Sequence, residues 1–382
     1  MIIASRYRPS RVFVVIASAV LLVTAALAAF HGWDYFRAAT LLLRIQNPQN
    51  PGTLSKITAT PFTEELTEVP TPSGPIRARS YVPSASPHAP GMVILHGVHH
   101  LGIDEPRLVA FARAVAASGI RVLTPELLSL TDYRIERASV DLIGYSARTL
   151  STSVGKKVGV LGLSFAGGLA LLAAADPRFG PSISFVVSVG AHDDLERVSQ
   201  FLVTNRIQRP DGTSLVMPAH EYGALILIYS HLEDFFPPAD VPIAHDTLRL
   251  LLWERVEESR KHSEQLSPES RKKMELLFGG HVEALTSEME GSIARHRMEM
   301  SAVSPHGQLG SLQVPVLLLH GAADNVVPPP ELLWLQQDIP PRVLKAELIS
   351  PAMSHVDMKG KPTLMDTLRL VGFMAHIFEL TD

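Results

Sequence analysis

The stretch GLSFAGG, residues 162–168, places a serine between glycines directly after the apolar run KVGVL at 157–161. A buried strand that turns sharply into a helix through small residues exposes the central serine at the carboxyl edge of a sheet, as a nucleophile elbow does. Ala166 stands where that motif usually has its last glycine, and two glycines follow it. The alternative is a glycine-rich turn made only for close packing of helix against strand. A phosphate-binding loop is disfavoured, because the stretch lacks Gly-Lys-Ser/Thr.

Strands and helices alternate on both sides of this turn. Short apolar runs predict strands buried on both faces, and the segments between them carry helical spacing. This β-α-β-α succession predicts an α/β fold with a mostly parallel central sheet and helices on both faces. Strands are predicted at 75–83, 91–97, 120–127, 157–163, 182–190, 314–321 and 344–350. Helices are predicted from about 104 to Gly119, and at Glu136–Ser151, Phe165–Ala175 and Thr363–Phe378.

The alternation is interrupted between about 195 and 311, where the chain becomes helical and more charged. Helices are predicted at 245–260, 267–278 and 281–300, with Ser267 as an N-cap and Pro268 in the first helical turn. We interpret this part as a helical lid inserted before the penultimate strand. Its apolar stretch EYGALILIYSHLEDFF (221–236) either forms an acyl-chain or aromatic pocket that faces Ser164, or is the core of the lid itself.

A serine nucleophile needs a base and an orienting acid, and both follow predicted strands. Asp324 lies in LLLHGAADNVVPP (317–329), and His355 lies in SPAMSHVDM (350–358). Parallel sheets build their sites at the carboxyl ends of strands, so Ser164, Asp324 and His355 are expected to meet there. The stretch ILHGVHH (94–100) ends another strand, so the backbone amide of Val98 is expected to form an oxyanion hole with that of Phe165.

From about Ile76 to Phe378 the chain resembles an α/β-hydrolase with a helical lid. The resemblance rests on LHGV, GLSFAGG, LLLHGAADNVVP and SHVD in this order. It implies Ser164 as nucleophile, His355 as base and Asp324 as acid. The expected activity is hydrolysis of a small-molecule carboxylic ester, with lipid-like esters as one option, through an acyl-enzyme and without a cofactor or metal. The alternatives are an acyltransferase or peptidase with the same triad, or a catalytically silent scaffold on a membrane.

Two groups of residues allow competing interpretations. Asp193 and Asp194 follow a strand and are an alternative position for the acid, although helix capping is the simpler interpretation. His96, His99 and His100 with Asp104 offer metal-binding atoms, but their spacing matches no zinc motif. We therefore expect His96 to support the oxyanion turn and the other two histidines to line the mouth of the site.

The N-terminus differs from the rest of the chain. Val12–Phe30 carries no charged residue and is long enough to span a bilayer as a helix. We expect a single-pass anchor that exposes an extracytoplasmic catalytic domain, or alternatively a signal that is cleaved near Ala28 to release a secreted protein. The predicted parts are a basic tail (1–11), the anchor or signal (12–30), a linker (31–56), the hydrolase core (57–194 and 312–382) and the lid (195–311).

Composition excludes several further classes. The chain of 382 residues carries a formal net charge of -4 and no basic block, so a nucleic-acid partner is not expected. It contains no cysteine, which excludes disulfides, thiolate nucleophiles and cysteine-bound zinc. Apolar residues make up 46% of the chain, enough for a large packed core.

Overall fold

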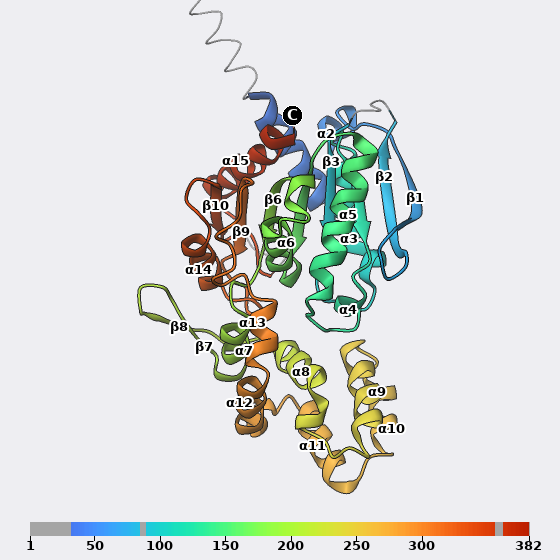
Figure 1. Ribbon diagram of the computed structural model, residues 1–382, viewed down its shortest axis with the longest axis vertical. Helices are drawn as coiled ribbons and strands as arrows, with labels where there is room; N and C mark the ends of the chain where they lie inside the picture. The colour runs from blue at the N-terminus through green and yellow to red at the C-terminus, as the bar shows by residue number, and fades with distance from the viewer. Residues whose placement is uncertain (1–31, 85–88, 356–361, 382) are drawn as a thin grey trace, which may run out of the picture.

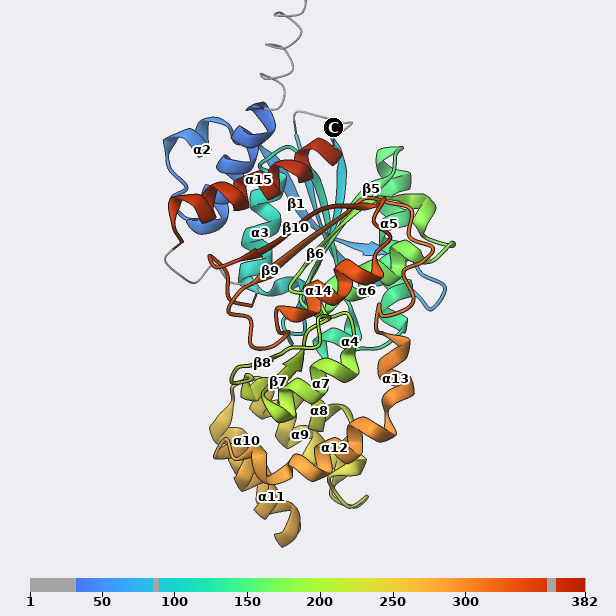
Figure 2. The same cartoon turned by 90° about the vertical axis from the view of Figure 1, so that its left-hand side faces the viewer.

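The computed structural model describes residues 32–84, 89–355 and 362–381 (Figure 1). The predicted membrane segment, Val12–Phe30, lies outside these residues. Within the described ranges, no helix combines the length and apolar character needed to cross a bilayer. The first described element is a helix over 32–46, which packs beside the C-terminal helix at one end of the molecule (Figures 1 and 2).

The described residues form an eight-stranded sheet in the order β1-β2-β4-β3-β5-β6-β9-β10. Strand β2 runs antiparallel to both of its neighbours, β1 and β4, and every other pairing is parallel. This order and this direction of strands are those of the α/β-hydrolase fold, which confirms the predicted fold class. The strands are β1 (Phe62–Val69), β2 (Ile76–Pro83), β3 (Gly91–Leu95), β4 (Arg121–Pro125), β5 (Val158–Leu163), β6 (Ile183–Val189), β9 (Val316–Gly321) and β10 (Leu344–Ser350).

Helices cover both faces of the sheet and bury its two apolar surfaces. One core contains α5 (Ala138–Val154), α6 (Phe165–Ala175) and α14 (Pro330–Asp338). The opposite core contains α3 (Pro106–Ala116), α15 (Leu364–Thr381) and the helix over 32–46. The short helices outside the insertion are α2 (Thr53–Ile57), α4 (Leu128–Thr131), η1 (Gly102–Asp104) and η2 (Gly180–Ser182).

Local sequence explains where these helices begin and end. Glu105 accepts a hydrogen bond from the amide of Leu108, and Pro106 occupies the first turn of α3. Helix α5 ends at Gly155, whose φ of 71° is the left-handed conformation typical of a helix end. The beginning of α3 and the end of α5 are thus set by their own residues, and both helices pack an apolar face on the sheet.

The segment 195–311, hereafter the insertion, lies beyond the carboxyl ends of the strands and at the opposite end from α15 (Figures 1 and 2). Ser267 caps a helix that begins at Pro268, as predicted. The predicted helix over 245–260 is two helices, because Glu254 adopts a φ of 62° between them. The insertion contains α7 (Leu195–Thr204), β7 (Arg206–Gln208), β8 (Ser214–Val216), α8 (Glu221–Ser230), η3 (Leu232–Asp234), α9 (Val241–Leu252), α10 (Val256–Ser263), α11 (Pro268–Phe278), η4 (Val282–Leu285), α12 (Thr286–Arg295) and α13 (Arg297–Ala302).

Candidate active site

Ser164 sits on a strained turn between β5 and α6. Its φ of 56° and ψ of -137° lie in a region that residues with a side chain rarely occupy, at a cost of about 1–3 kcal/mol. A Cβ on Gly162 would lie 2.5 Å from the carbonyl oxygen of Ala166, and one on Gly167 would lie 2.7 Å from Ser188 Oγ. The turn therefore requires glycine at these two positions and tolerates the alanine between them, so the departure from the usual motif leaves its geometry intact.

Asp324 and His355 form a direct pair in the loops that follow β9 and β10. The Nδ1–H of His355 donates to Asp324 Oδ2 over 2.7 Å, and the other carboxylate oxygen accepts from the amides of Val326 and Val327. Burial opposes ionisation of Asp324, but hydrogen bonds from His320 and His355 outweigh it and lower the pKa of Asp324 to about 2. A carboxylate on Nδ1 leaves Nε2 of His355 as the free acceptor, which is the atom that a base uses.

Gly190 brings this pair next to the turn at Ser164. The amide of Ser164 donates to the carbonyl of Val189 over 2.7 Å. A Cβ on Gly190, whose φ is +64°, would lie 3.3 Å from Asp324 Oδ2 and 3.6 Å from the carbonyl oxygen of His355. The three predicted residues thus gather around one end of β6. The described residues include no hydrogen bond between the Ser164 hydroxyl and the His355 imidazole.

The loop after β3 passes directly beside the serine. A Cβ on Gly97 would lie 3.3 Å from Ser164 Cβ, and Val98 follows at the next position. Phe165 opens α6, so its amide has no acceptor within the helix. Gly97 and Ser164 are thus in contact, and the amides of Val98 and Phe165 belong to the residues that follow them. An oxyanion hole would form between these two amides.

His96 supports this loop through both of its ring nitrogens. The amide of Leu127 donates to His96 Nε2 over 2.9 Å, and Nδ1 lies 2.7 Å from the carbonyl of Gly97. Burial lowers the pKa of His96 to about 4, so the ring is neutral with both nitrogens engaged. His99 and His100 stack on each other with ring centroids 4.6 Å apart, and His100 lies against Trp253 of the insertion.

The insertion covers these loops. The Tyr222 hydroxyl donates to the carbonyl of Val98 over 3.4 Å, and the amide of His220 donates to the carbonyl of Asn325 over 2.8 Å. Ser164 is only 4% exposed. A cleft of about 750 Å³ opens elsewhere, between α7, α12 and the β7–β8 hairpin, and none of the three predicted catalytic residues lines it.

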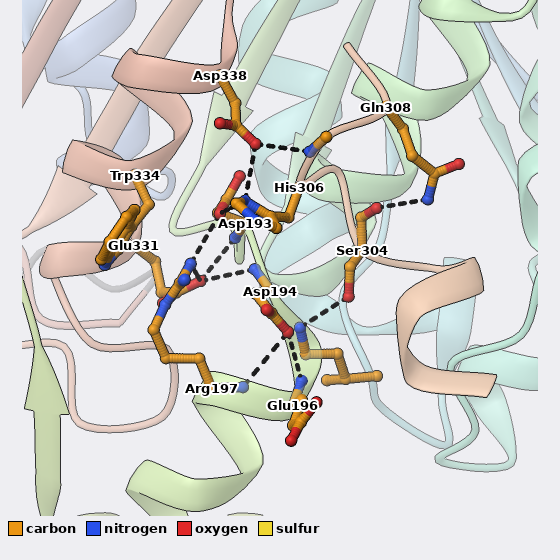
Figure 3. A network of polar contacts seen from close by, with 12 residues as sticks. Asp193, Asp194, Glu196, Arg197, Ser304, His306, Gln308, Glu331, Trp334 and Asp338 are labelled. Carbon is orange, nitrogen blue, oxygen red and sulfur yellow. Dashed lines mark hydrogen bonds and ion pairs between the residues drawn. The ribbon is translucent and has the colours of Figure 1, made fainter. Parts of the chain in front are cut away.

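The alternative acids have other partners. Asp194 caps α7 through hydrogen bonds from the amides of Glu196 and Arg197 to its Oδ1. Asp193 is fully buried and contacts Arg197 across 2.7 Å (Figure 3). Both carboxylates therefore belong to the base of the insertion, as the capping interpretation predicts for Asp194.

His320 is a contact of the site that the sequence analysis missed. Its Nε2 lies 3.5 Å from Asp324 Oδ2 and 2.8 Å from the carbonyl of Val327. His320 lies four positions before Asp324 in the same motif, and this proximity in the sequence could have indicated a contact between the two side chains.

No protein-family model matches the chain, and no curated protein matches it. Similar solved structures include 2,6-dihydroxy-pseudo-oxynicotine hydrolase, which is 15% identical with a TM-score of 0.45 over 83% of this chain and 68% of that one. A hyperthermophilic esterase from Pyrobaculum calidifontis is 17% identical, with a TM-score of 0.47 over 90% of each chain. An acylaminoacyl peptidase from Pyrococcus horikoshii is 10% identical, with a TM-score of 0.48 over 85% of this chain and 42% of that one. At these sequence identities, the similarity concerns the fold alone.

Proposed function

We propose that this chain is a serine hydrolase that cleaves carboxylic esters through Ser164, His355 and Asp324. The observation that carries the proposal is the pair of buried Asp324 and partly exposed His355 beside a serine held at a φ of 56°. The pair leaves an imidazole acceptor free, and the strained turn keeps the serine at the end of β5. Neither feature is required for packing a helix on a strand.

The reaction follows from these positions. His355 Nε2 takes the proton of Ser164 Oγ while the oxygen attacks the ester carbonyl carbon. Asp324 holds the imidazole in the required tautomer and stabilises the charge that it acquires. The amides of Val98 and Phe165 bind the developing oxyanion, each contributing about 10²–10³ in rate. The imidazolium returns the proton to the leaving alcohol, and water attacks the acyl-enzyme by the same steps.

An apolar acyl group fits the surroundings of the serine. Phe165 and Val327 belong to one apolar cluster, which also includes Phe201 of the insertion and borders Val98 and Met217. Because Ser164 is nearly inaccessible, we further propose that the insertion acts as a lid that moves to admit substrate. Its contact through Tyr222 with the carbonyl of Val98 would then open together with the site.

The proposal is tested first with a fluorophosphonate probe on the full chain. We expect covalent labelling that disappears in Ser164→Ala, with the folded state of the variant checked by its melting temperature. Labelling of wild-type protein that does not depend on Ser164, or no labelling of folded protein, contradicts the proposal and favours the silent scaffold.

A substrate panel separates the remaining activities. We expect hydrolysis of p-nitrophenyl esters of graded chain length and little cleavage of amino-acid p-nitroanilides. The reverse preference identifies a peptidase, and faster product formation with an added alcohol or amine acceptor identifies an acyltransferase.

The membrane anchor stays a proposal from the sequence of Val12–Phe30. We expect the mature protein to begin near Met1 and to remain in the membrane fraction after an alkaline wash. A mature N-terminus near Ala29 would instead show a cleaved signal.

A further inference from the structure

A buried polar network ties both ends of the insertion to α14 (Figure 3). The amides of Asp193 and Asp194 donate to Glu331 Oε2 over 2.7 and 3.0 Å. Arg197 lies between the two acids, with Nε 2.6 Å from Glu331 Oε1 and Nη2 2.7 Å from Asp193 Oδ2. The C-terminal end of the insertion joins the network at His306, whose amide donates to the carbonyl of Asp193 over 3.0 Å. None of these groups takes part in the proposed reaction.

The network holds more negative than positive charge. Asp193 and Glu331 are fully buried and contact the guanidinium of Arg197, and the side chain of Asp338 is 19% exposed. Three carboxylates against one guanidinium leave two negative charges when His306 is neutral. Uncompensated buried charge is costly, so this place favours an additional cation or proton.

Three ligand atoms converge at this point. His306 Nδ1 lies 3.2 Å from Asp193 Oδ2 and 2.9 Å from Asp338 Oδ2, and each of the three residues offers a ligand atom within 4.8 Å of the other two. Zinc bonds of about 2.0–2.2 Å in a tetrahedron place neighbouring ligand atoms about 3.4 Å apart. Asp193 also has a buried oxygen, Oδ1, that has no hydrogen-bond partner. Oδ2, the oxygen nearest His306, also contacts Arg197, so Oδ1 is the oxygen of this carboxylate that remains to coordinate a metal.

We propose that Asp193, His306 and Asp338 bind a divalent cation, with zinc as the best match to one imidazole and two carboxylates. The ion would cancel the two excess negative charges, and any proton on His306 Nδ1 would leave for solvent. His306 is about half exposed, with 49% of its side chain accessible, so water can reach the ion as a fourth ligand. Because the three ligands come from the start of the insertion, its end and α14, the ion would fix the base of the insertion to the core.

A second histidine cluster in the insertion provides a matched control. His231, Glu233 and His296 also lie within 4.8 Å of one another. The two imidazoles are stacked nearly parallel, with centroids 3.6 Å apart, so the lone pairs of their nitrogens lie in parallel planes and do not point toward one ion. Both nitrogens of His296 already face carboxylates, Asp234 at 3.1 Å and Glu299 at 3.3 Å. We therefore expect no metal at this cluster.

The test measures metal binding by the full, tag-free chain after treatment with a chelator. Zinc content is determined after equilibrium dialysis against Zn²⁺, and Co²⁺ serves as a spectroscopic probe of ligand geometry. We expect one zinc ion per chain in the wild type and in His296→Ala, and at least tenfold weaker binding in His306→Ala and Asp338→Asn. Zn²⁺ should raise the melting temperature of the wild type and leave that of His306→Ala unchanged.

Several outcomes overturn the proposal. The proposal is overturned if the wild-type protein binds no zinc above background. It is also overturned if His306→Ala and Asp338→Asn bind zinc as tightly as the wild type. Loss of binding only in His296→Ala would assign the metal to the other cluster. If one variant fails to fold, the other decides, because Asp338→Asn preserves the shape of the side chain and His306 is half exposed. Labelling of Ser164 by the fluorophosphonate is measured separately, so failure of this site and failure of the proposed function are distinguishable.

Discussion

Replacement of Asp324 by asparagine is the sharpest test of the catalytic assignment. The amide oxygen of asparagine can still accept from Val326 and Val327, whose amides lie 3.0 and 2.9 Å from Oδ1 of the aspartate. The amide nitrogen, however, would face His355 Nδ1 as a donor. This favours the tautomer with the proton on Nε2, which cannot accept the proton of Ser164. We expect kcat to fall by about 10⁴-fold, equivalent to about 5 kcal/mol.

The loss of stability should be much smaller than the loss of activity. The pKa of Asp324 is lowered from 3.8 to about 2, so its surroundings favour the carboxylate by about 2 kcal/mol. A carboxylate with a lowered pKa stabilises the fold above the pKa of the unfolded chain, and this contribution is lost as the pH falls from about 4 to 2. The difference in unfolding free energy between wild type and Asp324→Asn should therefore shrink in that window.

The assay is steady-state hydrolysis of a p-nitrophenyl ester, together with denaturant unfolding of each variant. Asp240→Asn is the matched control, because Asp240 is a buried carboxylate in the insertion that accepts hydrogen bonds from Ser267 and Ser270. It should lose stability and keep kcat. If Asp324→Asn stays within tenfold of the wild-type rate, the assignment of the acid is wrong, and a collapse of activity in Asp194→Asn would move the acid there.

Gly190→Ala should lower the free energy of unfolding by about 1 kcal/mol, because it places a side chain at φ +64°, and should lower kcat about tenfold, because the new Cβ lies 3.3 Å from Asp324 Oδ2. Gly155→Ala is the control, since its Cβ at φ +71° meets open space; unfolding and kinetic assays should show a loss of stability alone. His96 has its pKa lowered to about 4, so the wild type should lose up to about 3 kcal/mol as the pH falls from 6.5 to 4, and unfolding of His96→Gln should lack this slope. Tyr222→Phe removes a 3.4 Å hydrogen bond to the carbonyl of Val98 and should lower kcat/KM less than about tenfold; a loss of 10³-fold would give Tyr222 a direct role in the reaction.

Buried strands could be predicted from the sequence because they are continuous apolar runs, whereas β1 could not. Phe62–Val69 reads FTEELTEV, and all of its side chains are half-buried or exposed except that of Val69. It stands at the edge of the sheet beside β2, and its Glu64 forms ion pairs with Arg79 and Arg113. An edge strand with charged residues has no apolar run to mark it, and its identity depends on partners far along the chain.

The catalytic candidates were accessible to prediction for a different reason. Ser164, Asp324 and His355 each follow a predicted strand, and parallel strands bring their carboxyl ends to one edge. The polar network at the base of the insertion follows no such rule. Glu331 and Arg197 lie 134 positions apart, and His306 approaches them only after the whole insertion has returned to the core. Such contacts depend on the packing of the insertion, which local patterns do not encode.

Helix α8 shows the limit of apolarity as a guide to function. The run ALILIY was compatible with a substrate pocket or with a structural core. Ile226 and Ile228 are 7% and 0% exposed and belong to an apolar cluster formed mostly by the insertion, which also includes Tyr133 and contacts Val98. Leu225 is only half-buried and packs at the border of this cluster. A helix that is apolar on every side gives no periodic signal for the face that meets the active site. The hydrogen bonds between this helix and the site loops come from His220, which precedes its first residue, and from the hydroxyl of Tyr222. Substrate preference in this chain is therefore to be sought in the residues that touch Val98 and Asn325, and polar substitution of Ile226 or Ile228 should lower stability and leave chain-length preference unchanged.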